Sequence, residues 1–265
     1  MIDIGVNLSN PRFAKDIEET LNRAQQAGLE KLILTGTSID ESRAVVELCE
    51  NHSQDFPKML YATAGIHPHD ASTLNRESIG MLRDIAAKPQ VVAIGEMGLD
   101  FNRNFSTPAE QEKAFEAQLE LAVECQLPVF LHERDAAERQ LQILRHYRDH
   151  LVDAVTHCFT GSKQALFGYL DINMHIGITG WVCDEKRGQE LQQLVSNIPL
   201  ERLMVETDAP YLLPKTMLEP PKGKRNEPAF LPWVIKGVAD YRKESIEQIT
   251  RATRNNALRF FRLDR

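Results

Sequence analysis

The amino-acid sequence predicts an α/β protein built as a single-domain (β/α)8 TIM barrel. Two observations predict this fold: eight short apolar runs of strand length alternate with segments of helical periodicity, and no Pro/Gly/Ser-rich linker divides the 265 residues. Short strands that are apolar throughout are typical of parallel strands buried on both faces. Eight such βα units fit a barrel better than an open doubly wound sheet, so we expect one domain over residues 1–265.

The expected strands are the apolar runs, which are bounded by turn-forming or polar residues. In chain order they are Ile2–Leu8, Leu32–Gly36, Met59–Gly65, Val91–Gly95, Pro128–Leu131, Ala154–Thr156, Ile172–Ile178 and Leu203–Val205.

The expected helices have apolar residues at helical spacing, and several begin with Pro, Asp or Ser. They are Phe13–Ala27, Ser42–Glu50, Leu74–Ala86, Pro108–Glu124, Ala136–Tyr147, Lys186–Val195, Ala229–Tyr241 and Ser245–Phe261. The proline-rich stretch Pro214–Pro228 is expected to be a long loop over the barrel mouth.

Composition excludes several classes of protein. A hydrophobic content of 42% with 14 Gly and 13 Pro excludes a disordered or low-complexity chain. No apolar run is long enough to span a membrane, and the start lacks a signal-peptide pattern, so we expect a cytoplasmic protein. The four widely spaced cysteines are expected to be reduced thiols. The net charge of −7 does not exclude nucleic-acid binding, because the site itself can be positive or hold metal.

Polar or ionisable side chains follow six of the eight expected strands, at the end of a barrel where active sites lie. These residues are Asn7, His67 and His69, Glu96, His132, His157, and Glu206 with Asp208. The second and seventh strands end near Thr35, Thr37 and Thr179 instead.

Glu96, His132 and His157 follow the fourth, fifth and sixth strands, which are neighbours in a barrel and can bring three ligands to one ion. One such histidine alone is usually a hydrogen-bonded core residue, but three at one rim favour a metal site. Imidazole and carboxylate suit Mg²⁺, Mn²⁺ or Zn²⁺, and three ligands leave a position for a water of lowered pKa. Asp208 could be a further ligand or the base that orients this water, or a carboxylate that caps the following turn.

A basic rim points to an anionic substrate. Arg103 and Arg134 lie near strand ends, and guanidinium groups pair with phosphate oxygens. His67 and His69 could contact a substrate phosphate or a second ion, or hold their own loop in place. Trp181 and Tyr211 could stack on bases or simply pack.

Over nearly its whole length the chain resembles the TatD-type deoxyribonucleases, which are metal-dependent hydrolases with a (β/α)8 barrel. The resemblance rests on seven motifs in order: GIHPH at 65–69, IGEMGLDF at 94–101, FLHERDA at 130–136, HCFTG at 157–161, GITG at 177–180, ETDAPYL at 206–212 and RNEP at 225–228.

The resemblance implies that Glu96, His132, His157 and Asp208 bind a divalent ion, with Asp208 and Glu96 catalytic. It also implies 3′ to 5′ exonuclease action on single-stranded DNA, and on RNA, supported by magnesium. A metal-activated water would attack the phosphate, with Asp208 as acid/base. His67, His69 and Arg103 or Arg134 would then stabilise charge on the phosphoryl oxygens. Polarity and sugar preference follow from the resemblance alone.

The first strand departs from the family. Many members have a DxHxH pattern there that supplies two further ligands, whereas this chain reads DIGVN, with Gly5 and Asn7 in place of both histidines. We therefore expect one tight metal site, and a second that is weak, filled only with substrate, or absent.

Three other functions are weighed against the nuclease. An amidohydrolase-like hydrolase of a small amide, ester or lactone would keep the barrel and metal, but the basic rim favours phosphate. A lysine-based aldolase is disfavoured because no Lys ends any strand. A binding protein without turnover is disfavoured because the four site residues are retained together. No apolar surface stripe indicates an interface, so a monomer without membrane partners is expected.

Overall fold

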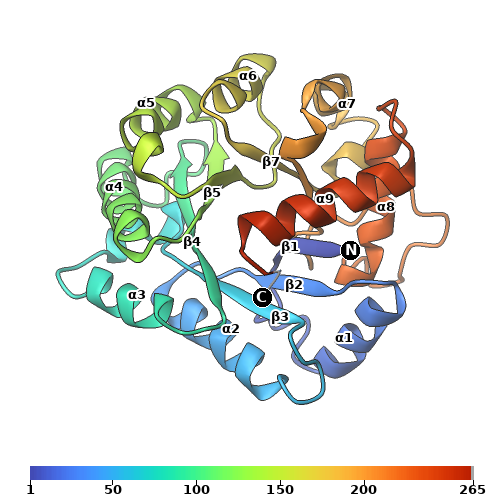
Figure 1. Ribbon diagram of the computed structural model, residues 1–265, viewed down its shortest axis with the longest axis horizontal. Helices are drawn as coiled ribbons and strands as arrows, with labels where there is room; N and C mark the ends of the chain where they lie inside the picture. Colours follow the sequence, from blue (N-terminus) through green and yellow to red (C-terminus); the bar gives the residue numbers. More distant parts are fainter. Residues whose placement is uncertain (264–265) are drawn as a thin grey trace.

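A computed structural model describes residues 1–263, and within them eight parallel strands pair in the order β1 to β8 (Figure 1). A parallel bridge joins Val6 of the first strand to Ala209, in the segment that follows the last strand, and the Asn7 N–H donates to the Ala209 carbonyl at 2.8 Å. The strands are β1 (Ile2–Val6), β2 (Lys31–Leu34), β3 (Leu60–Ala64), β4 (Val91–Asp100), β5 (Val129–Arg134), β6 (Ala154–Thr156), β7 (His175–Ile178) and β8 (Leu203–Val205). The predicted (β/α)8 barrel is confirmed.

Helices surround the barrel (Figure 1). They are α1 (Ile17–Gln26), α2 (Ile39–Asn51), α3 (Ser78–Ala86), α4 (Pro108–Cys125), α5 (Ala137–Tyr147), α6 (Lys163–Asp171), α7 (Gln189–Leu194), α8 (Leu231–Ala239) and α9 (Ile246–Phe260). Helix α4 begins with a capping box in which Thr107 and Glu110 satisfy each other's backbone N–H groups. No helix within residues 1–263 is long and apolar enough to cross a membrane.

The barrel is closed at the end where the strands begin. Helix α9 lies across the sheet (Figure 1). Its last residue, Phe260, and the following Phe261 pack in one buried cluster with Ile2 and Ile4 of β1 and Val92 of β4. A second, larger cluster lies between the sheet and the outer helices. The opposite end, where the strands finish, is left open for a site.

Several predicted bounds differ from those in the structure. Strand β4 runs to Asp100 rather than Gly95, because Gly95 and Gly98 adopt positive φ and a register shift lets pairing with β5 continue. Helix α6 was not predicted as a separate element. Its apolar residues run directly into Ile172, which ends the helix, so β7 begins only at His175.

The seventh helix was predicted to begin too early. It starts at Gln189, not Lys186, because Asp184 accepts the backbone N–H groups of Lys186 and Arg187 and holds them in a turn.

Candidate active site

A cavity of about 1140 Å³ lies at the open end of the barrel. Every residue predicted to bind metal or substrate lines it: His67, His69, Glu96, Arg103, His132, Arg134, His157 and Asp208. These residues lie at the ends of five strands, so the barrel brings them together in one cavity as predicted.

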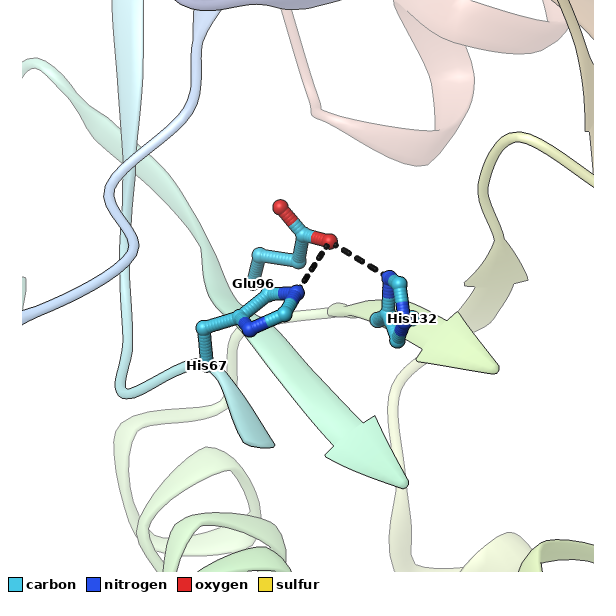
Figure 2. A group of neighbouring side chains, drawn as sticks. All are labelled: His67, Glu96 and His132. Atoms are coloured by element: carbon cyan, nitrogen blue, oxygen red, sulfur yellow. Dashed lines mark hydrogen bonds and ion pairs between the residues drawn. The ribbon is translucent and has the colours of Figure 1, made fainter. Parts of the chain in front are cut away.

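The carboxylate of Glu96 lies at the centre of the cluster. Its Oε1 atom is 2.8 Å from Nε2 of His157, 2.9 Å from Nδ1 of His132 and 3.2 Å from Nε2 of His67. Figure 2 shows the Glu96 carboxylate between His67 and His132. Burial opposes the charge on Glu96, but the surrounding imidazoles lower its pKa well below its usual value. Glu96 is therefore an anion with three nitrogens directed at one oxygen.

The donor set fits a divalent ion. Ligand atoms of His67, Glu96 and His132 lie within 4.8 Å of one another, close enough to share a cation. Mixed imidazole and carboxylate ligands suit ions from Mg²⁺ to Zn²⁺. Because His157 also contacts the shared Glu96 oxygen, three histidines compete for the role of ligand.

Hydrogen bonds to the second ring nitrogen separate these histidines, since a ligand nitrogen must keep its lone pair. Nδ1 of His67 accepts the backbone N–H of His69 at 3.1 Å, so neutral His67 has its proton on Nε2 and donates toward Glu96. Nδ1 of His157 instead faces the carboxylate of Glu206 at 3.3 Å, which favours a proton on Nδ1. Burial disfavours a second proton on the ring, but Glu96 and Glu206 raise the pKa of His157 well above its usual value, so an ion that binds Nε2 displaces the proton that faces Glu96. His157 is thus oriented to bind an ion, whereas His67 is oriented to donate a hydrogen bond.

Glu206 ends the eighth strand, and sequence reasoning assigned it no role. It is fully buried, and its Oε1 accepts the backbone N–H of Cys158 at 2.5 Å. A Cβ atom on Gly5 would collide with Oε2, and one on Gly177 would come within 2.6 Å of Oε1. Gly5 therefore makes room for the carboxylate behind His157.

Asp208 lines the same cavity, in a backbone conformation with positive φ. Its Oδ1 accepts the side-chain N–H of Asn7 at 3.0 Å. Burial, together with the nearby Glu206 and Glu96 carboxylates, raises the pKa of Asp208 to about 7, although His157 and the Asn7 hydrogen bond oppose the rise. A carboxyl group with this pKa can accept or donate a proton near neutral pH.

His69 is held in place rather than free. Its Nε2 lies 2.7 Å from Oδ2 of Asp100, a buried residue that also lies 3.4 Å from Nε2 of His132. Asp100 was missed because the sequence around it reads as a loop rather than the end of β4. Arg103 and Arg134 are exposed on the cavity rim, where their guanidinium groups can meet an anion.

Comparison with known proteins adds an independent line of evidence. The model of the TatD-related DNase family matches residues 2–262. The chain is 49% identical over 263 residues to the "3′-5′ ssDNA/RNA exonuclease TatD" of Edwardsiella piscicida, covering 99% of this chain and 100% of that protein. It is 48% identical over 261 residues to the protein of the same name from Salmonella typhimurium, covering 98% of each.

Solved structures agree with this similarity. The TatD homologue YJJV from Escherichia coli is 29% identical, with a TM-score of 0.88 over 99% of this chain and 98% of that one. A TatD-family hydrolase from Entamoeba histolytica is 25% identical, with a TM-score of 0.90 over 98% of this chain and 97% of that one.

Proposed function

The chain belongs to the TatD-related DNase family and is a hydrolase of phosphodiester bonds, and we propose that it removes nucleotides from the 3′ end of single-stranded DNA and RNA. The proposal includes one tightly bound divalent ion, Mg²⁺ by preference with Mn²⁺ or Zn²⁺ as substitutes, and action as a monomer. A second ion is weakly bound or absent, because Gly5 and Asn7 supply neither imidazole of the DxHxH pattern.

Glu96, His132, His157 and Asp208 are the proposed ligands. The observation that supports this most strongly is the pairing of His157 Nδ1 with Glu206, which leaves Nε2 directed at the same point as Glu96 Oε1. When bound, the ion supplies Lewis-acid polarisation of the phosphodiester and makes water a stronger acid.

The side chains around Glu96 Oε1 have the remaining roles in the reaction. Asp208, whose Oδ1 is oriented by Asn7, accepts the proton of the attacking water. His67 donates from Nε2 to negative charge near Glu96, and its pKa, lowered by burial, keeps it a neutral donor. Arg103, Arg134 and His69 stabilise charge on the phosphoryl oxygens from the rim.

The test is incubation of metal-stripped protein with single-stranded DNA labelled at its 5′ end, with and without Mg²⁺ or Mn²⁺. A ladder that shortens stepwise from the 3′ end, only with metal, is the expected result. Immediate release of a short labelled product would reverse the polarity. Absence of cleavage with any ion would refute the nuclease assignment.

A further inference from the structure

Phe105 is an aromatic residue that the barrel leaves in solvent beside the active site. Its side chain is 66% exposed, in the loop between β4 and α4. Arg103, two residues earlier, lines the cavity. The Phe105 ring therefore offers free apolar surface that a planar ligand can cover.

The loop that presents Phe105 is held at both ends. Oδ1 of Asp100 accepts the backbone N–H groups of Asn102 and Arg103 at 3.0 and 2.8 Å. Ser106, which follows Phe105, donates from Oγ to the His69 carbonyl at 3.0 Å. The ring is therefore exposed by a fixed backbone rather than by a loop that lacks contacts.

Phe105 also contacts the catalytic cluster. Its ring centroid lies 4.8 Å from that of His69, with the planes at 82°, an edge-to-face pair. His69 lies 4.3 Å from His67 by the same measure, and His67 reaches Glu96. A base resting on Phe105 would thus belong to a nucleotide close to the scissile phosphate.

The other aromatic residues of the rim are less available. The Arg187 guanidinium lies over the Trp181 ring, 4.4 Å from its centroid, so stacking of a base there would require that guanidinium to move. Tyr211 is 51% exposed, but its hydroxyl accepts a hydrogen bond from Asn10. Phe105 offers the most exposed ring of the three.

Resting on the proposed function, we propose that Phe105 is the stacking platform for one unpaired base near the 3′ end of the substrate. Stacking on an aromatic ring accepts any base but requires a face that a double helix would cover, so the platform selects single strands rather than a sequence. Arg103 would hold the phosphate attached to the same nucleotide.

The test is equilibrium binding of a fluorescent single-stranded oligonucleotide to protein with Asp208→Asn, which removes turnover, in the presence of Mg²⁺. Phe105→Ala should weaken binding about 5- to 150-fold, the effect of losing one base–aromatic stack. Phe105→Leu keeps an apolar side chain without a ring and should lose nearly as much, whereas Phe105→Trp should retain affinity. Phe167→Ala, at an exposed ring on α6, is the matched control.

Oligonucleotides with an abasic site at each of the last positions locate the contact. At one position, base removal should weaken binding to the parent but not to the Phe105→Ala protein. Unchanged affinity of Phe105→Ala, or losses that add at every abasic position, would overturn the proposal. Stepwise cleavage by the protein with Asp208 intact is measured separately, so failure of the nuclease assignment is distinguishable from failure of the platform.

Discussion

Replacement of Glu206 by glutamine should weaken metal binding, although Glu206 itself is not a proposed ligand. The carboxylate has two acceptor oxygens and a donor faces each: Cys158 N–H at 2.5 Å and His157 Nδ1 at 3.3 Å. Glutamine keeps the size of the side chain but has only one acceptor, so its NH₂ group must face a donor. His157 can relieve this only by moving its proton to Nε2, which removes the lone pair needed by the ion.

Loss of such a supporting partner typically reduces metal affinity 10- to 100-fold, or about 1.4 to 2.7 kcal/mol. The assay is calorimetric titration of metal-stripped protein with Mn²⁺. The melting temperature without metal is measured alongside, because a purely structural defect would lower it without changing the affinity of the folded protein.

Glu133→Gln is the matched control for Glu206→Gln. Glu133 lines the cavity and its replacement removes the same charge, but its carboxylate accepts the backbone N–H of Ala136 and, within residues 1–263, no histidine nitrogen. Parent-like affinity for Mn²⁺ in Glu206→Gln, or an equal loss in Glu133→Gln, would refute the reasoning about the His157 tautomer.

Three further predictions concern the first and last strands. Asp208→Asn should abolish turnover while leaving the fold intact, because an amide cannot accept the proton of the attacking water; near-normal turnover of the variant at saturating metal would exclude Asp208 as the base. Gly5→Ala should weaken Mn²⁺ binding as Glu206→Gln does, because the added Cβ collides with that carboxylate; unchanged affinity in the same titration would show that the space is not needed. Burial raises the pKa of Asp3 from 3.8 to about 8. Between about pH 4 and 8 the folded protein therefore keeps a proton that the unfolded chain releases, and the free energy of unfolding falls as pH rises through this window. Asp3→Asn should flatten this pH dependence in urea unfolding measured from about pH 5 to 9, and an unchanged slope would contradict the prediction.

The barrel could be predicted because apolar strands and helix-period segments alternate without interruption. The meeting of Glu96, His132 and His157 followed from the fold itself, since the ends of adjacent parallel strands share one rim. The sequence predicts an end of β4 at Gly95, because glycine and a charged residue normally end an apolar run. Its continuation to Asp100 depends on positive φ at Gly98 and on pairing with β5, which are not local properties.

The supporting residues of the site could not be predicted for a related reason. Gly5 was interpreted as a lost ligand, whereas the structure shows that it makes room for Glu206, about 200 residues away in the chain. His67 and His157 look equivalent in sequence, as histidines after apolar strands. Only the partner of each Nδ1, a backbone N–H for His67 and a carboxylate for His157, distinguishes donor from ligand.

The most direct test of the metal site is the anomalous diffraction of a crystal soaked in Mn²⁺. We predict one strong peak in contact with Glu96, His132 and His157 on the side of Asp208, with His67 outside the coordination sphere. A peak bound by His67 without His157, or two equally strong peaks before substrate is added, would contradict the account.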